Sequence, residues 1–272
     1  MRWEELTAPG RGVQLHVRRV VEPLAPPLLL LHGLGVGGAV WQAFARRLLP
    51  ALAAVAPDLR GHAQSDAPPS GYQPADYATD LAELIPALLA PPVAVAGHSL
   101  GALVGLALAS LHPELVRWLA LLDPPLDPDL ANPEISSVYQ LRHAPAGALE
   151  AYLLERNPGG GQLLADQLAR LFRQAADGAF EAMLDRRAVG WSLDQVAHVR
   201  QPVLILQADP ARGGVLGDMA AQALVERLPR ATLVKVAGAT HSLHASQPAE
   251  TARAILEFAQ AQAQATGAVS ST

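Results

Sequence analysis

The sequence predicts an α/β fold built on a doubly wound, mostly parallel sheet, on the strength of three observations. Six short, largely apolar runs recur along the 272-residue chain, and such runs are typical of strands buried on both faces. Stretches with helical spacing separate the early runs, as in βαβ units. Between residues 127 and 200 the alternation stops, and helical spacing continues without a convincing strand. We therefore expect one core, residues 1–126 and 201–272, with a helical cap or lid inserted at 127–200.

The elements follow in order from the N-terminus. Arg2 to Thr7 and Val13 to Val20 are predicted to form a hairpin around the turn residues Pro9 to Gly12. The expected parallel strands are Leu28 to Leu31, Ala53 to Ala56, Val93 to Ala96, Leu119 to Leu122, Val203 to Leu206 and Leu233 to Val236. The expected helices between the early strands are Val40 to Leu49, Tyr77 to Leu89 and Ala102 to Leu111.

Composition narrows the possible functions. Half of the residues are apolar, enough to bury one sizeable core plus an insertion. The net charge of −5 argues against nucleic acid or an anionic membrane surface as the main partner. Because the chain has no cysteine, disulfides, thiol catalysis and cysteine metal sites are excluded, and we expect neither metal nor cofactor. The composition leaves the oligomeric state open.

Two further absences concern the location of the protein. No apolar stretch approaches the ~18 residues that can span a bilayer. The first residues, Met1 to Glu5, lack the basic and apolar regions of a signal peptide. We therefore expect a cytoplasmic protein.

The pentapeptide Gly97-His98-Ser99-Leu100-Gly101 lies directly between an expected strand and an expected helix. A Gly-X-Ser-X-Gly turn at such a junction strains the serine backbone, and the flanking residues without a Cβ make this conformation possible. The strain directs the serine hydroxyl outward at the carboxyl edge of the sheet. The alternative is a glycine-rich connection whose serine only caps the helix. The catalytic interpretation makes Ser99 a nucleophile and requires an acid and then a histidine downstream.

Both requirements can be met. Asp209 stands just beyond the expected strand Val203 to Leu206, and His241 lies in the loop after the last strand. The order Ser99, Asp209, His241 is the order expected of a serine hydrolase built on this kind of sheet. Asp123 and Asp218 also obey that order, so three candidates for the acid remain. Asp209 is the preferred candidate, in the loop after the strand that precedes the histidine strand.

Four segments together resemble the α/β-hydrolase family. Leu28 to Gly35 resembles a strand followed by the His-Gly oxyanion turn, with Trp41 at a position that commonly carries an aromatic residue. Asp58 to Asp66 is similar to the Asp-X-Arg-Gly-X-Gly-X-Ser loop, although Ala63 replaces the usual second glycine. The nucleophile pentapeptide and His241 to Pro248 complete the series. The resemblance covers most of the chain and implies the α/β-hydrolase fold. One departure is Arg212, which occupies the position where the family often has its aspartate.

The chemistry follows from these residues. His241 is expected to take the proton of the Ser99 hydroxyl during attack, while the acid orients the imidazole. The backbone N–H groups of Leu34 and Leu100 are expected to form the oxyanion hole. His32 and His98 flank tight turns, and we expect them to hold loops by hydrogen bonds.

A dinucleotide-binding interpretation competes with this one. Gly33 to Gly38 satisfies Gly-X-Gly-X-X-Gly after a strand, and Asp58 follows at another strand end. That fingerprint needs its glycines to open a helix, whereas the helical pattern here starts later, near Val40. It also leaves Ser99 and His241 unexplained, so we set it aside.

The substrate is less well specified. The inserted segment holds seven arginines and ten acidic residues and thus shows no cationic pocket for polyanions. Its many leucines and alanines suit an apolar acyl or alcohol group. We therefore predict a serine carboxylesterase with a small, largely apolar ester substrate. The alternatives are a lactonase, a carbon–carbon bond hydrolase or a perhydrolase, or a receptor that binds a small ligand with little turnover.

Overall fold

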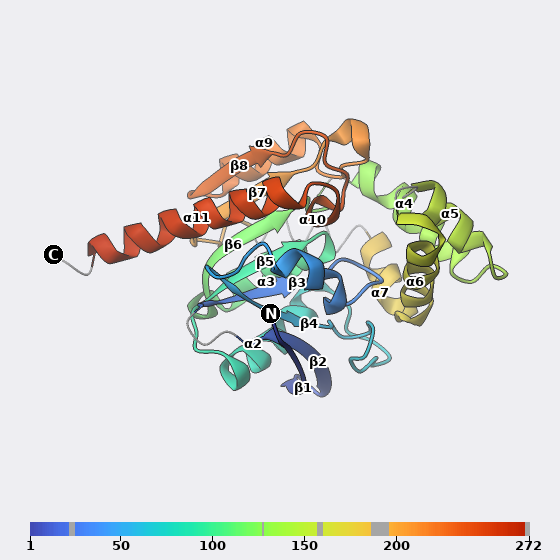
Figure 1. Ribbon diagram of the computed structural model, residues 1–272, viewed down its shortest axis with the longest axis horizontal. Helices are drawn as coiled ribbons and strands as arrows, with labels where there is room; N and C mark the ends of the chain where they lie inside the picture. Colours follow the sequence, from blue (N-terminus) through green and yellow to red (C-terminus); the bar gives the residue numbers. More distant parts are fainter. Residues whose placement is uncertain (22–24, 127, 157–159, 186–195, 270–272) are drawn as a thin grey trace.

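An eight-stranded sheet forms the centre of the molecule (Figure 1). The computed structural model describes residues 1–21, 25–126, 128–156, 160–185 and 196–269. The strands are β1 (Trp3–Gly10), β2 (Val13–Val20), β3 (Pro27–Leu31), β4 (Ala53–Pro57), β5 (Val93–His98), β6 (Val116–Leu122), β7 (Val203–Gln207) and β8 (Ala231–Lys235). Their order is β1-β2-β4-β3-β5-β6-β7-β8. The hairpin β1–β2 joins β4 in antiparallel fashion, and all other neighbours are parallel. The predicted doubly wound sheet is confirmed.

Helices cover both faces because alternate side chains of each strand point to opposite sides. In β3, Leu29 and Leu31 pack into one apolar cluster with α2 (Pro74–Leu88), α3 (Leu100–Leu111) and α9 (Asp218–Arg227). Leu28 and Leu30 pack into the cluster on the other face, with α1 (Gln42–Ala45) and α11 (Pro248–Val269). The short elements η1 (Gly38–Trp41), η2 (Pro113–Leu115), η4 (Pro210–Arg212) and α10 (Leu243–Ser246) lie in the connections.

The expected helix at Val40 to Leu49 differs from the structure, which has the short η1 and α1 there. The chain then continues in turns closed by bonds such as Leu48 N–H to Ala45 O. Pro50 lacks the N–H that a continuing helix needs. Trp41 and Phe44 in this stretch are buried nonetheless. Their spacing therefore indicates buried positions and does not define the length of a helix.

Between β6 and β7, the described residues form the helices α4 (Pro128–Leu141), α5 (Ala148–Arg156), α6 (Gly161–Gln174) and α7 (Asp177–Leu184). They occupy the segment expected as a cap, of which residues 186–195 lie outside the described part. Figure 1 shows this α4–α7 layer standing beside the sheet, apart from the helices that cover its faces. The layer has its own apolar cluster, which includes Val138, Leu149 and Phe180.

Arg142 holds the α4–α7 layer together from inside. Its buried guanidinium donates to the carbonyl oxygens of Phe172 and Ala175 and pairs with Asp177. It also lies 4.5 Å from the centre of the Phe180 ring. A cation so fully engaged is structural, and it fixes α4, α6 and α7 relative to one another.

Candidate active site

Ser99 occupies the tight turn between β5 and α3. Its backbone adopts φ 53° and ψ −117°, a left-handed φ that costs a residue with a side chain free energy. A Cβ on Gly97 would collide with the carbonyl oxygen of Gly101, and a Cβ on Gly101 would collide with that of Leu31. Both glycines are therefore required sterically, as the motif predicts. The Ser99 N–H donates to Leu122 O at 3.0 Å, which ties the turn to the end of β6.

The turn after β3 packs directly against Ser99. β3 and β5 are neighbours in register, with Leu31 opposite Gly97, so the loops that follow them lie side by side. A Cβ built on Gly33 would lie 3.4 Å from Ser99 Cβ. Within the described part of the chain, the N–H groups of Leu34 and Leu100 donate to no acceptor. Leu100 is the first residue of α3, where helix N–H groups lack internal partners and the dipole is positive.

His241 is paired with Asp123. His241 Nδ1–H donates to Asp123 Oδ2 at 2.7 Å, which leaves Nε2 as the unprotonated nitrogen of a neutral ring. The Asp123 side chain is 0% exposed and that of His241 is 24% exposed. Asp123 itself has φ 46°, and its N–H donates to Leu206 O at 2.8 Å. The pair thus lies at the carboxyl edge of the sheet, on the loops after β6 and β8.

The buried carboxylate of Asp123 is satisfied by the backbone of the loop after β7. Oδ2 accepts from Val215 N–H at 2.8 Å, and Oδ1 accepts from Ala208 and Leu216 N–H at 3.2 and 3.3 Å. A buried carboxylate needs such donors because desolvation otherwise disfavours its charge. The loop after β7 therefore supplies donors to the acid instead of the acid itself.

The structure does not bring the expected acid, Asp209, to His241. The Asp209 carboxylate accepts from Ala211 N–H at 3.0 Å and caps η4. Asp218, the third candidate, lies on the surface, where it binds Lys235 Nζ at 2.7 Å and Gln207 Nε2 at 2.8 Å. The expected Asp209–His241 pairing is corrected accordingly. Local capping of η4 directs Asp209 along its own turn, away from the histidine loop.

Two further histidines hold the loops around Ser99, as expected from the sequence. His32 accepts from Leu59 N–H at 2.9 Å through Nε2 and donates from Nδ1 to Gly33 O at 2.8 Å. His98 Nε2–H donates to the carbonyl oxygen of His241 at 2.9 Å. Burial lowers the pKa of His32, and it lowers the pKa of His98 well below its usual value. Both rings are therefore neutral hydrogen-bonding groups near pH 7.

The sequence offered little to single out the contact made by His98. Its ring lies between those of His241 and His244, with centroids 4.6 and 4.9 Å away. Trp41 lies behind His244 at 4.4 Å. This arrangement joins the Ser99 turn to the loop that carries His241, a contact 143 residues apart in the chain.

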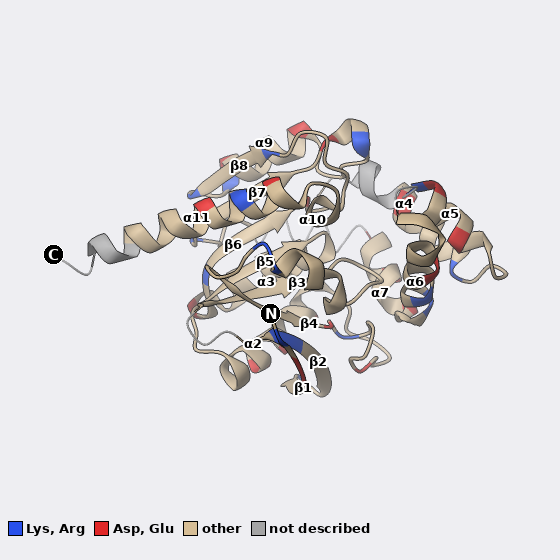
Figure 2. Ribbon diagram, viewed as in Figure 1, with Lys and Arg blue, Asp and Glu red and all other residues tan. Residues whose placement is uncertain are grey.

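The α4–α7 layer covers the turn after β3. A Cβ on Gly35 would collide with the ring of Phe172 and would lie 3.1 Å from Phe180. The side chain of Leu34 packs against both the sheet core and the cluster of the layer. The surface over the turn is therefore apolar. Acidic and basic residues are interspersed on α4 to α6, with neither sign gathered in one region (Figure 2).

Other kinds of site find no support in the described residues. Within those ranges, no three His, Asp or Glu side chains come together to hold a metal ion. None of the described helices is both long and apolar enough to cross a bilayer. The glycines of the dinucleotide alternative open the short η1, and Gly38 N–H donates to the Asp58 carboxylate at 2.6 Å. That contact occupies the donor that a phosphate would need.

Asp123 could have been preferred from one signal in the sequence. It directly follows the strand that comes next in the sequence after the Ser99 strand, and consecutive strands are usually neighbours in a sheet. The competing signal, the usual position of the acid after the following strand, outweighed it. The choice depends on which loop turns its side chain inward, and that is a tertiary property.

Comparisons with known proteins find relatives that are named as hydrolases. The first relative is the 2-(acetamidomethylene)succinate hydrolase of Mesorhizobium japonicum, 33% identical over 253 residues, which cover 87% of this chain and 88% of the relative. A putative carbamate hydrolase of Serratia proteamaculans is 40% identical over 108 residues, 39% of this chain and 40% of that protein. These relatives are hydrolases by name.

Solved structures are similar over nearly the whole chain. The crystal structure of E-2-(acetamidomethylene)succinate hydrolase gives a TM-score of 0.79 at 26% identity, covering 95% of this chain and 100% of the other. A thermophilic esterase from Thermogutta terrifontis gives 0.77 at 20% identity, covering 95% and 99%, and this likeness concerns the fold alone. The alpha/beta hydrolase family model matches residues 28–254, which include Ser99, Asp123 and His241. The strained serine turn, the His241–Asp123 pair and this match together show that the chain belongs to the alpha/beta hydrolase family.

Proposed function

We propose that this protein is a serine hydrolase that cleaves carboxylic esters of small, largely apolar substrates through an acyl-enzyme, with Ser99 as nucleophile, His241 as base and Asp123 as the orienting acid. The observation that carries the proposal is the 2.7 Å bond between His241 Nδ1 and the fully buried Asp123 carboxylate. It fixes the tautomer whose Nε2 can accept a proton. Asp123 replaces Asp209 in this role.

The proposed reaction has two halves. Ser99 Oγ attacks the ester carbonyl carbon while His241 Nε2 takes the hydroxyl proton, and the carbon–oxygen bond to the alcohol then breaks as His241 returns the proton to the alkoxide. Water attacks the acyl-enzyme in the same way and releases the carboxylic acid and free Ser99. In this structure Ser99 and His241, both within the described residues, form no hydrogen bond with each other. Catalytic contacts of this kind tighten when substrate binds.

The N–H groups of Leu34 and Leu100 are the proposed oxyanion donors. Both are unpaired within the described residues and flank Ser99 from two different loops. Donors that are already oriented stabilise the oxyanion without a reorganisation cost at the moment of reaction. The loss of one such donor typically costs about 10²–10³ in kcat.

The proposed substrate preference rests on the apolar cover over the oxyanion turn. Leu34, Phe172 and Phe180 meet there, and the one deeply buried cation of the described part of the layer, Arg142, is already engaged by carbonyl oxygens and Asp177. A neutral, apolar acyl group suits these surroundings better than a charged one. Lactone, carbon–carbon and perhydrolase chemistry would use the same nucleophile, and remain alternatives.

A second candidate is hydrolysis of an amide-type bond. The relative that matches 87% of this chain is named for a substrate with an acetamido group. The same serine, base and oxyanion donors would serve, with His241 protonating a nitrogen leaving group.

The test is turnover on a matched series of p-nitrophenyl esters of increasing acyl length, with the corresponding acetanilides in parallel. We expect ester turnover, and loss of about 10⁴ or more in kcat for Ser99→Ala. A fluorophosphonate should label Ser99 and leave the partly exposed Ser137 unmodified, as mass spectrometry of the adduct will show. Turnover of the anilides alone would favour the amide candidate. Ligand binding without turnover of any member would favour a receptor, and a label on another residue would sink the assignment.

A further inference from the structure

A groove of about 1150 Å³ lies at the edge of the sheet opposite the candidate active site. It is lined by the starts of three parallel strands, at Pro27, Val93 and Trp118. Ser99 and Asp123 follow the other ends of β5 and β6. Parallel strands place all their amino ends at one edge of the sheet. The groove and the candidate catalytic residues are therefore separated by the length of the strands.

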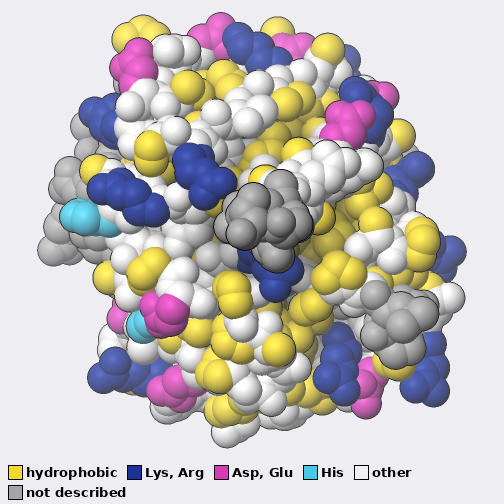
Figure 3. All heavy atoms as spheres, turned by 90° about the vertical axis from the view of Figure 1, so that its left-hand side faces the viewer, with side chains coloured by type: hydrophobic (Ala, Val, Ile, Leu, Met, Phe, Trp, Pro, Cys, Tyr) yellow, Lys and Arg dark blue, Asp and Glu magenta, His cyan; other side chains and the backbone are white. Residues whose placement is uncertain are grey.

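The floor of the groove is apolar. Trp118, Leu52 and Val93 form it, and Trp118 is only 3% exposed. One wall is α11, through Ala252, Leu256, Ala259 and Ala263. Figure 3 shows this face of the molecule, with apolar side chains exposed in the hollows beside the projecting end of α11.

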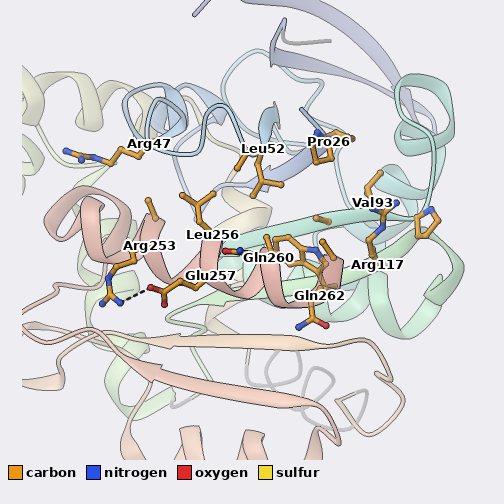
Figure 4. A pocket seen from close by; sticks show the side chains of 18 of the residues that line it. Pro26, Arg47, Leu52, Val93, Arg117, Arg253, Leu256, Glu257, Gln260 and Gln262 are labelled. Carbon is orange, nitrogen blue, oxygen red and sulfur yellow. Dashed lines mark hydrogen bonds and ion pairs between the residues drawn. The ribbon is translucent and has the colours of Figure 1, made fainter. Parts of the chain in front are cut away.

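Positive charge surrounds this apolar floor. The lining includes Arg46, Arg47, Arg117 and Arg253, against Glu257. Arg253 is bound by Glu250 and Glu257. The guanidinium groups of the other three arginines bind no side chain or carbonyl among the described residues. Figure 4 shows Arg47 and Arg117 toward opposite ends of the groove, with Leu52 and Leu256 between them.

We propose that this groove binds a free long-chain carboxylate, with the carboxylate on Arg117 and the chain lying along Trp118 and Leu256 toward Arg47. Arginine presents two parallel N–H groups that match a carboxylate. Arg117 lies at the Val93 end of the groove, and its guanidinium has no side-chain or carbonyl partner among the described residues. A neutral lipid would leave Arg117 without a partner, and a small anion would leave the apolar floor exposed.

A free amphiphile also suits the charges better than an anionic membrane. The whole chain carries a net charge of −5, and a negatively charged protein is repelled by such a surface at long range. One unpartnered arginine at the end of a concave apolar floor is enough to hold one carboxylate, whereas surface binding relies on a broader basic face. The inference does not depend on the proposed ester hydrolysis, because none of its residues lies near Ser99.

The experiment is titration calorimetry of the full chain with dodecanoate below its micelle concentration, with hexanoate and dodecyltrimethylammonium as matched probes. We expect dodecanoate to bind with one site, hexanoate more weakly and the cation not at all. Arg117→Gln should weaken dodecanoate binding by about tenfold, the loss typical of one charge-assisted bidentate contact. Arg47→Gln should weaken it less, and Arg227→Gln, on α9, should leave it unchanged.

A second variant acts on the wall. Ala259→Glu places a carboxylate in the groove on an already helical segment, and we expect it to abolish binding while the melting temperature and ester turnover stay as in the wild type. Dodecanoate binding that survives both Arg117→Gln and Ala259→Glu would overturn the proposal. So would binding only to anionic vesicles, or a wild-type dimer that Ala259→Glu converts to monomer, since the groove would then serve a membrane or a second copy. Loss of ester turnover in Ser99→Ala with dodecanoate binding retained would separate this proposal from the proposed reaction.

Discussion

The loops after β6 and β7 each carry an aspartate within two residues of the strand end, and the two side chains differ in burial and in hydrogen-bond partners. Asp123 is fully buried, adopts φ 46° and binds His241. Asp209, two residues beyond the end of β7, is partly exposed and caps the short η4. The difference lies in the backbone that surrounds each carboxylate. Three N–H groups from the loop after β7 point at Asp123, whereas Asp209 accepts from its own turn.

This contrast teaches that a buried catalytic acid is made by its donors as much as by its sequence position. Taking a carboxylate out of water is costly unless hydrogen bonds replace the lost hydration. The loop after β7 provides that replacement for the aspartate of the neighbouring loop. Sequence position alone therefore assigns the acid to the loop after β7, whereas the acid lies in the loop after β6.

The largest expected effect tests the contrast directly. Asp123→Asn should lower kcat for ester hydrolysis by about 10⁴, because the amide favours the wrong imidazole tautomer. Asp209→Asn and Asp218→Asn make the same replacement of a carboxylate by an amide at the other two candidates. They should leave kcat within about twofold, and the free energy of unfolding within ~0.5 kcal/mol, of the wild-type values. Steady-state rates beside melting curves distinguish lost chemistry from lost structure. An inactive Asp209→Asn protein with normal Asp123→Asn activity would reverse the comparison.

The next effect concerns how the His241 loop is held against the Ser99 turn. His98→Ala removes the 2.9 Å bond to the His241 carbonyl oxygen, and the loss of one buried hydrogen bond, about 1–3 kcal/mol, should lower kcat by about 10–100-fold. His98→Gln retains an N–H donor and should recover part of the rate. KM should change less than kcat, since the substrate contacts remain. Equal rates for all three proteins would mean that the bond does not position His241.

A smaller effect is expected on stability at acid pH. It compares the buried base His244 with the buried acid Asp123 at the same edge of the sheet. His244 lies on the His241 loop, and burial lowers its pKa to about 4, against about 6.5 unfolded. The unfolded state therefore binds more protons between those two pH values. The contribution of His244 to the free energy of unfolding is fully present above pH 6.5 and is lost as the pH decreases toward 4. The slope from this group is about 1.4 kcal/mol per pH unit.

Urea unfolding at pH 7, 6 and 5 measures that slope. Buried His32, His62 and His98 act in the same direction, since the pKa of each is lowered. His244→Phe keeps an aromatic ring beside Trp41, 4.4 Å from the present ring, and should reduce the slope by about one proton. An unchanged slope would show that His244 is not neutral in the folded protein.

The smallest expected effect compares two residues with a left-handed φ, Asp123 in the candidate active site and Ala63 outside it. Ala63 and Asp123 share φ 46°, but the conformation of Asp123 directs a carboxylate to His241, whereas Ala63 has no polar side chain to direct. Ala63→Gly restores the residue that the related loops usually carry. The relief of a left-handed alanine, about 1 kcal/mol, is partly offset by the entropy of an unfolded glycine. We expect a gain of up to about 0.5 kcal/mol in urea unfolding, with kcat unchanged, and a destabilised variant would contradict this account.

The sequence by itself determined the parts of this protein whose physical cause is local. Apolar runs fixed the strands because parallel strands are buried on both faces, and steric demand at Gly97 and Gly101 fixed the Ser99 turn. The histidine loop and the His-Gly turn followed from their motifs. The helix predicted at Val40 to Leu49 is longer than the observed helical elements, because apolar spacing alone does not mark where helical hydrogen bonding stops.

Only the tertiary structure decided which aspartate meets His241. The choice depends on backbone N–H groups that are 85 to 93 residues from Asp123 in the chain, and such donors leave no mark in the local sequence around the acid. The same holds for His98, whose acceptor is 143 residues away, and for the groove, where strand ends far apart in the chain meet α11. Contacts of this range arise only when the sheet has brought its edges together.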